Sequence, residues 1–279
     1  EVVRPRTLRA RGDVLDEQTA LLRRAQVALG ESPFEQISLA QARQIFRNNF
    51  PLVRMIGGLF EKVHATRDLS IPSRDGGIPA RLYLPGEEKD YPLLVYFHGG
   101  GWVIGDCNTV DNISRFFCRH IPCAVLSVEY RLAPEHPFPA AVEDALSAVE
   151  WAAAHARELN ADPARMLVGG DSSGGNLSAV VAQQTRDKGT PRLAAQVLLY
   201  AVTDGSSLET PSYRTFGEKS LGLSKKDMKW FLDQYAPDAE TRLDPRLSPS
   251  LSKNLQNLPP ALVVTAEFDV LRDEAETYA

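Results

Sequence analysis

The chain has 279 residues, of which 43% are hydrophobic and 24% are charged, and its 31 basic against 36 acidic side chains give a formal net charge of −5. This composition is typical of a globular protein and excludes disordered, collagen-like and coiled-coil chains. The acidic balance disfavours a nucleic-acid partner, and because no long apolar run occurs we expect no membrane-spanning helix. A small-molecule ligand is expected, with the protein a monomer or a homodimer.

The cysteines and the start of the chain bear on its location. Cys107, Cys118 and Cys123 form neither an even set of disulfide partners nor a metal-binding C-x2-C pair. The first 30 residues lack the apolar run and the small-residue cleavage site of a signal peptide. We therefore expect a reducing, cytoplasmic location. Because the sequence begins without Met, we also expect that residues are missing at its N-terminus.

The first part of the chain is predicted to be helical. Apolar residues recur at helical spacing through residues 8–60, with breaks at a glycine and a proline, which predicts two or three helices. The pattern then changes to short β-rich runs at 69–72 and 78–84. The Asp-Gly-Gly tripeptide at 75–77 between them is typical of a hairpin turn, so an antiparallel pair should open a sheet.

Unbroken apolar runs follow at intervals, as expected for strands that are buried on both faces of a parallel sheet. They are residues 93–97, 123–128, 166–168, 196–200 and 261–265. Helical patterns at 140–159 and 176–188 lie between them. This alternation predicts an α/β fold with a mostly parallel central sheet flanked by helices.

Residues 203–258 interrupt the alternation and contain one clear helical pattern, at 224–235. We expect this segment to be an insertion over one end of the sheet, and to form a helical cap together with residues 1–60. The α/β core would then comprise residues 61–202 and 259–279.

The pentapeptide pattern Gly170-x-Ser172-x-Gly174 lies directly after one predicted strand and before a predicted helix. This is the context of a nucleophile elbow, in which a tight turn holds a serine at the carboxyl edge of the sheet. The flanking glycines are needed because the turn leaves almost no room for side chains. A purely structural glycine-rich turn is the alternative.

A second glycine motif, His98-Gly99-Gly100-Gly101-Trp102, directly follows the predicted strand 93–97. Consecutive glycines leave backbone amides free to approach a ligand, and the pattern matches the oxyanion-hole turn of lipases and esterases. Such amides stabilise the negative charge of a tetrahedral intermediate. A flexible glycine linker is the alternative.

These two motifs make the chain resemble the hormone-sensitive-lipase family of α/β-hydrolase-fold carboxylesterases, in its bacterial branch with a Gly-Asp-Ser-x-Gly-Gly elbow. The resemblance runs from about residue 66 to the end and includes segments 129–135 and 137–141, which it implies shape the site from below. It implies Ser172 as the nucleophile and the amides of Gly100, Gly101 and Ser173 as the oxyanion hole. Ser173 stands where the family usually has Ala; because only its amide takes part, we expect little effect.

The acid of a catalytic triad should follow the nucleophile in this fold. The segment after strand 261–265 resembles the family's Asp-x-Leu-Arg-Asp sequence, which points to Asp269 as the acid. Asp273, one helical turn on, is the competitor, with helix capping or a salt bridge as its other interpretation. Glu267 is a weaker third candidate.

The histidine of the triad is missing from the expected place. The five histidines, His64, His98, His120, His136 and His155, all precede Ser172, whereas this fold places the histidine after the acid. We expect it beyond Ala279, on the interpretation that the sequence is truncated before a last strand and helix. The resemblance implies that His98 braces the oxyanion turn and does not act as the base.

The predicted reaction is hydrolysis of short- to medium-chain esters through an acyl-enzyme, with no cofactor and no metal. Trp102, Leu221 and Phe231 are candidate pocket-lining residues by position, and ordinary core packing is the alternative for each. Two other functions stay open on the same scaffold. One is a non-catalytic receptor for small molecules, and the other is an amidase or peptidase with the same triad.

Overall fold

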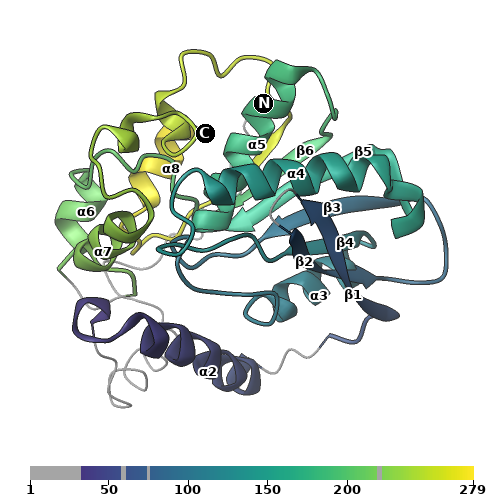
Figure 1. Ribbon diagram of the computed structural model, residues 1–279, viewed down its shortest axis with the longest axis horizontal. Helices are drawn as coiled ribbons and strands as arrows, with labels where there is room; N and C mark the ends of the chain where they lie inside the picture. The colour runs from purple at the N-terminus through teal and green to yellow at the C-terminus, as the bar shows by residue number, and fades with distance from the viewer. Residues whose placement is uncertain (1–32, 58–60, 74–75, 219–221) are drawn as a thin grey trace.

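A computed structural model describes residues 33–57, 61–73, 76–218 and 222–279 (Figure 1). Its strands are β1 (Ala65–Ser73), β2 (Gly76–Leu84), β3 (Tyr91–Phe97), β4 (Ala124–Val128), β5 (Ala161–Asp171), β6 (Ala195–Leu199) and β7 (Ala261–Val264). They form one sheet in the order β1-β2-β4-β3-β5-β6-β7. The β1–β2 and β2–β4 pairs are antiparallel and the other pairs are parallel. The predicted mostly parallel α/β sheet is confirmed.

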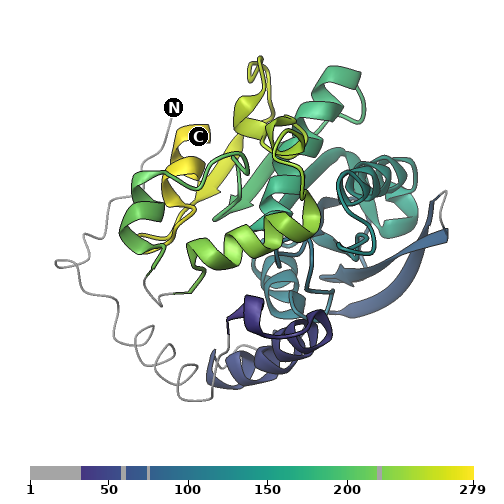
Figure 2. The same cartoon turned by 60° about the vertical axis from the view of Figure 1, so that its left-hand side comes forward.

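Helices cover both faces of the sheet and gather at one of its ends (Figures 1 and 2). The α-helices are α2 (Leu39–Gly57), α3 (Asp111–His120), α4 (Ala140–Ala154), α5 (Ser173–Lys188), α6 (Pro211–Phe216), α7 (Lys225–Tyr235) and α8 (Arg272–Tyr278), and the short 3-10 helices are η1 (Phe34–Gln36), η2 (Ala156–Leu159), η3 (Thr241–Leu243) and η4 (Pro249–Leu251). None of the helices in the described ranges is both long and apolar enough to cross a membrane.

The central strand β3 shows why the apolar runs form strands with no polar face. Successive side chains of a strand point to opposite faces. Leu93, Val95 and Phe97 accordingly join the core cluster that includes residues of α4 and α5. Leu94 and Tyr96 join a second cluster beneath α3. Because both faces are covered, an uninterrupted apolar run is the sequence pattern that this position requires.

Three details differ from the predictions. The strand β2 begins at Gly76, which pairs with Ser73, so the expected turn 75–77 overlaps a strand. Helix α5 begins at Ser173 and not at residue 176, because the turn after β5 leads directly into the helix. The expected helices before residue 33 lie outside the described residues.

Helix α3 was not predicted, and its buried face explains why. That face carries Asp111 and Ser114 beside Phe117 and Cys118, so half of its buried residues are polar. The Asp111 carboxylate accepts a hydrogen bond from the Tyr83 hydroxyl at 3.0 Å. The helix is thus held partly by a buried polar contact that the hydrophobic pattern cannot reveal.

The start of α5 packs against the end of β3 without space for a side chain. A Cβ atom built on Gly174 would overlap the carbonyl oxygen of Phe97 and crowd that of His98. A Cβ atom on Gly170 would likewise meet the Phe97 carbonyl oxygen. Two glycines therefore bring the turn after β5 into backbone contact with the turn after β3.

We predict that Gly174→Ala lowers the free energy of unfolding by about 3 kcal/mol, because the methyl group meets rigid backbone. Gly189→Ala is the matched control, since Gly189 has a φ of +76° but open space around its Cβ position, and it should cost only about 1–2 kcal/mol. Urea denaturation of both variants measures the difference. An equal decrease in the free energy of unfolding for both variants would show that the close backbone contact at Gly174 does not exclude a methyl group.

Candidate active site

The carboxyl ends of four neighbouring strands lie at the same level of the sheet. Phe97 of β3 is in register with Gly170 of β5, Gly170 with Leu198 of β6, and Leu198 with Val263 of β7. The candidate residues from three distant parts of the sequence follow these ends within a few positions. In open α/β sheets, ligands bind outside this carboxyl edge.

Ser172 occupies the turn between β5 and α5 with backbone angles φ +53° and ψ −118°. These angles are unfavourable for a residue with a side chain, and such strain is held at functional sites by surrounding contacts. Here the Ser172 amide donates to the Leu199 carbonyl at 2.9 Å, and the Ser172 carbonyl accepts from the amides of Asn176 and Val202. The predicted elbow is thus a strained turn anchored on three sides.

The glycine turn after β3 is folded back on itself by two backbone hydrogen bonds. The Gly100 carbonyl accepts from the amides of Val103 at 3.1 Å and Ile104 at 3.0 Å. Gly100 has a φ of +118° and Gly101 a φ of +58°, and a Cβ atom on Gly100 would overlap the Ile104 carbonyl. The turn therefore needs glycine at these positions.

Asp171 joins the two turns through its side chain. The Tyr96 hydroxyl donates to its carboxylate at 2.9 Å, and the carboxylate lies so close to Gly99 that a Cβ atom there would overlap it. Burial raises the pKa of Asp171 to about 6, although hydrogen bonds from Tyr96 and the Gly99 amide oppose the rise. The sequence analysis included Asp171 in the elbow motif but gave its side chain no role. A carboxylate directly before the candidate nucleophile was the feature that could have indicated one.

His98 is buried inside the glycine turn. Its ring stacks on Tyr130 with centroids 4.4 Å apart, and its Nδ1 lies 2.7 Å from the Gly99 carbonyl oxygen. Burial lowers the pKa of His98, which keeps the ring neutral. Tyr130 in turn donates its hydroxyl to the His98 carbonyl at 2.7 Å. These contacts are those of a brace for the turn.

Asp269 and Asp273 have different partners. The Asp269 carboxylate accepts a hydrogen bond from the Leu271 amide at 3.0 Å, and burial raises its pKa. Asp273 accepts from the Ser212 amide at 2.7 Å and pairs with Arg272 at 2.8 Å. Asp273 thus ties α8 to the start of α6, whereas Asp269 bonds within its own turn.

Tyr200 lies between the elbow and the Asp269 turn. It directly follows β6, has a φ of +37°, and its amide donates to the Val264 carbonyl. Tyr200 is 38% exposed, but partial burial of the phenol raises its pKa, and the negative charges of Asp171 and Asp269 raise it further. Sequence reasoning did not single out Tyr200.

The three candidate pocket residues have different surroundings. Trp102 is fully buried and stacks on Tyr235 at 4.5 Å. Phe231 of α7 lies on the Gly101 backbone, where a Cβ atom would overlap its ring. The Phe231 ring also packs against the ring of Phe34 in η1, with ring centroids 5.0 Å apart. Leu221 lies outside the described residues.

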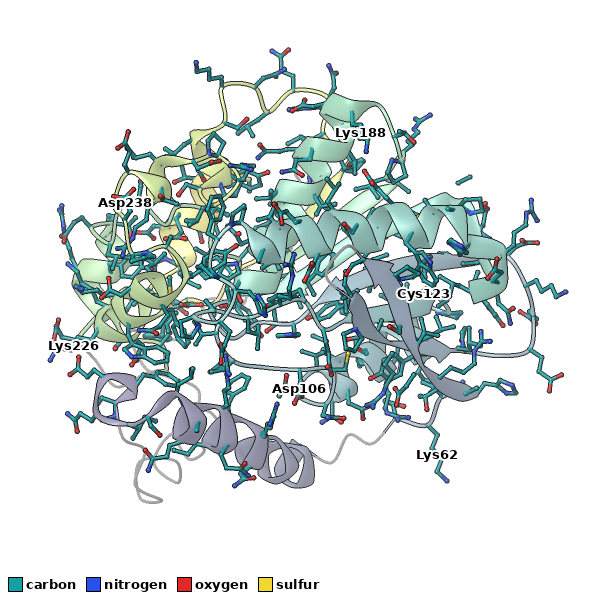
Figure 3. All side chains as sticks on the ribbon, in the orientation of Figure 1. Lys62, Asp106, Cys123, Lys188, Lys226 and Asp238 are labelled. Atoms are coloured by element: carbon teal, nitrogen blue, oxygen red, sulfur yellow. The ribbon has the colours of Figure 1, made fainter. Side chains whose placement is uncertain are left out.

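Asp106, which follows the glycine turn, lies close to helix α2 (Figure 3), where Arg47 donates to its carboxylate. In the described ranges, no group of three His, Cys, Asp or Glu residues is arranged to hold a metal ion. The five histidines lie within those ranges, and none of them hydrogen-bonds to Ser172 or Asp269 there: His120 pairs with Glu61, and His155 bonds to the Trp151 carbonyl.

Comparisons with known proteins agree with this geometry. Residues 94–279 match the family model described as alpha/beta hydrolase fold. The carboxylic ester hydrolase LipN of Mycobacterium tuberculosis is 53% identical over 218 residues, which cover 76% of this chain and 57% of LipN. The ethyl acetate hydrolase of Pseudomonas putida is 37% identical over 254 residues, which cover 88% of this chain and 78% of that protein. The chain thus spans little more than half the length of LipN.

Solved structures of esterases have the same fold. An esterase from Pyrobaculum calidifontis superimposes with a TM-score of 0.87 at 39% identity and covers 93% of this chain and 83% of its own. A thermostable esterase from Pseudomonas putida superimposes with a TM-score of 0.87 at 36% identity and covers 95% and 82% of the two chains.

The raised pKa of Asp171 predicts a pH-dependent stability. Between the ordinary pKa of an aspartate and about 6, the folded protein holds a proton on this carboxyl that the unfolded chain releases. The free energy of unfolding is therefore highest at low pH and falls as the pH rises through about 6. Relative to Asp171→Asn, the wild type should lose about 2 kcal/mol between about pH 4 and about pH 7. Urea denaturation at both pH values tests this, with the exposed Asp187→Asn as the control. Parallel stability curves for the wild type and Asp171→Asn would contradict it.

Proposed function

The chain belongs to the alpha/beta hydrolase fold family, and on this premise we propose that it is a serine carboxylesterase of the hormone-sensitive-lipase branch that hydrolyses short- to medium-chain esters. The observation that carries the proposal is the strained Ser172 turn packed against the glycine turn after β3. The ester hydrolase names of the relatives support it. The sequence Gly-Asp-Ser-Ser-Gly-Gly at 170–175 supports the branch.

In the proposed mechanism the Ser172 hydroxyl attacks the ester carbonyl carbon and the carbonyl oxygen becomes negative. The amides of Gly100, Gly101 and Ser173 stabilise that oxygen. The Gly100 carbonyl faces Val103 and Ile104, and in a planar trans peptide the carbonyl and the next amide point in opposite directions. The Gly101 N–H therefore points away from the turn, free to donate to substrate.

The Ser172 proton needs a base, and the alcohol leaving group needs that proton. We propose that a histidine supplies both transfers and that Asp269 orients it, as in other triads. The proposal puts this histidine after Ala279, following the chain order of the fold. Water then repeats the attack on the acyl-enzyme, releases the acid and restores Ser172.

We also propose that residues 1–60 and 203–258 form a cap over this edge. Their described parts meet there, since Phe34 of η1 stacks on Trp230 of α7 at 5.3 Å. The Phe231 ring, which lies on Gly101, would form an apolar wall next to the reacting carbonyl. Trp102 stacks on Tyr235 of the same helix, and we keep Trp102 and Leu221 as proposed lining residues.

Ser172→Ala should reduce ester hydrolysis by about 10⁶-fold, to background, because it removes the nucleophile. The measurement is p-nitrophenyl butyrate hydrolysis by the protein expressed from its complete gene. A fluorophosphonate probe should label the wild type and leave Ser172→Ala unlabelled. A well-folded wild type without turnover would favour the small-molecule receptor, and turnover of anilides above esters would favour an amidase.

Asp269→Asn should lower kcat by about 10⁴-fold, since the histidine loses the carboxylate that orients it. Asp273→Asn is the matched control, because in the described part of the chain the Asp273 carboxylate pairs with the structural partners Ser212 and Arg272. That variant should keep kcat within about 5-fold while losing about 1–3 kcal/mol of stability. If Asp273→Asn gave the larger loss of kcat, the acid would be reassigned to Asp273.

A further inference from the structure

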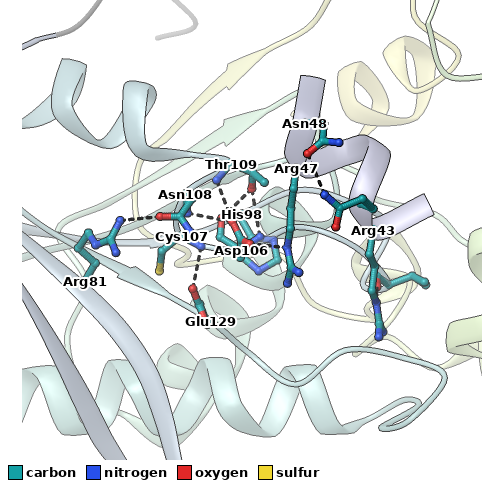
Figure 4. Close-up of polar contacts among 12 residues, drawn as sticks. Arg43, Arg47, Asn48, Arg81, His98, Asp106, Cys107, Asn108, Thr109 and Glu129 are labelled. Carbon is teal, nitrogen blue, oxygen red and sulfur yellow. Dashed lines mark hydrogen bonds and ion pairs between the residues drawn. The ribbon is translucent and has the colours of Figure 1, made fainter. Parts of the chain in front are cut away.

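Arg43 extends from helix α2 (Figure 4) and bonds to the residue that follows the glycine turn. Its Nε donates to the Val103 carbonyl at 3.0 Å and its Nη2 to the Ala133 carbonyl at 3.0 Å. Both terminal nitrogens also donate to the Glu135 carboxylate at 2.7 Å, in a bidentate pair. The guanidinium is therefore fixed in plane and direction, which is the geometry that Arg and not Lys provides.

The contacts of Arg43 close a ring of hydrogen bonds around the residues that follow the glycines. The Ala133 amide donates to the Trp102 carbonyl at 2.9 Å, and Arg43 connects the Ala133 carbonyl to the Val103 carbonyl. The 131–135 loop thus holds the Trp102 carbonyl, and Arg43 of α2 holds the Val103 carbonyl. Neither carbonyl is left to move independently of these two segments.

The Val103 residue is in turn what orients the Gly101 amide. The Val103 amide, together with that of Ile104, holds the Gly100 carbonyl. That carbonyl belongs to the same rigid peptide unit as the Gly101 N–H, so a rotation of one is a rotation of the other. A displacement of Val103 is therefore transmitted to the donor that would face the oxyanion.

We propose that Arg43 is a positioning residue for ester hydrolysis, which acts from α2 to hold the Gly101 amide in its oxyanion-binding direction. The inference rests on the proposed function, because it assigns Arg43 to that reaction. It gives helix α2 a role beyond covering the site. Glu135 fixes the guanidinium, and Val103 passes its position to the glycine turn.

Arg47 is the matched control on the same helix, one turn further along. Its Nε donates to the Asp106 carboxylate at 2.9 Å (Figure 4). Asp106 holds the amides of Asn108 and Thr109, beyond the residues that bond to Gly100. Loss of Arg47 therefore weakens the attachment of α2 without touching the Trp102–Val103 pair.

The kinetic test compares Arg43→Ala, Arg43→Lys and Arg47→Ala in the p-nitrophenyl butyrate assay, well below the melting temperature of each variant. A misdirected oxyanion donor affects the transition state more than substrate binding. Arg43→Ala should therefore lower kcat by about 10- to 100-fold and change KM by less than about 3-fold. Arg43→Lys should restore part of kcat, and Arg47→Ala should stay within about 3-fold of the wild type. An unchanged kcat in Arg43→Ala would overturn the proposal, as would an equal loss in Arg47→Ala.

A second readout does not depend on activity. Amide hydrogen exchange, followed by mass spectrometry on peptides that cover 98–105, should be at least about 10-fold faster in Arg43→Ala than in the wild type. Exchange in peptides from β5 and α5 should not change, and Arg47→Ala should not alter residues 98–105. Unchanged exchange at 98–105 overturns the role of Arg43 even if the wild type is active. If exchange is faster in Arg43→Ala but the wild type is inactive, Arg43 still holds the turn. The esterase function is then overturned, and with it the role of Arg43 in ester hydrolysis.

Discussion

Backbone contact between two turns is the constraint on which the rest of the site depends. The turn after β5 reaches the turn after β3 only because Gly170 and Gly174 present no side chain to the Phe97 carbonyl. This contact puts the proposed nucleophile and the proposed oxyanion amides on one rigid unit, since both turns extend strands that pair in the parallel register Phe97 to Gly170. Catalysis by preorganised dipoles requires such fixed geometry, because donors that had to reorganise during the reaction would lose most of their advantage.

Contacts from other segments stabilise the strained backbone of these two turns. Ser172 keeps its unfavourable backbone angles because β6 and the residues after it bond to both its amide and its carbonyl. Gly101 keeps its position because Phe231 covers it from α7 and because Arg43 holds Val103 from α2. Helix α7 therefore contacts the glycine turn through Phe231, and helix α2 contacts the residue after it through Arg43. The described parts of the proposed cap are therefore joined to the sheet at its carboxyl edge.

The sequence predicted those parts of the fold whose causes are local. Strands that are buried on both faces require apolar runs such as 93–97, and tight turns require glycines. The sheet and the two glycine turns could therefore be predicted from the sequence. Helix α3 was missed because Asp111 and Ser114 occupy half of its buried face. The contacts of Arg43, Asp171 and Phe231 could not have been predicted, because each joins positions far apart in the chain. Such partners depend on side-chain direction in the folded state, about which composition and periodicity carry no information.

The acidic cluster after β7 illustrates how the structure distinguishes residues that the sequence leaves equivalent. Within six positions the chain has Asp269, Asp273 and Glu274, and burial raises the pKa of the first and the last. Glu274 accepts the Thr203 amide at 2.8 Å and Asp273 accepts the Ser212 amide, so each fixes a different loop. Both anchor α8 to segments that follow β6, and the turn that carries Asp269 is thereby held from its C-terminal side. Asp269 bonds only to backbone of its own turn in the described part of the chain, which leaves its carboxylate available to orient another group. The neighbours thus perform the structural work that a catalytic acid could not perform at the same time.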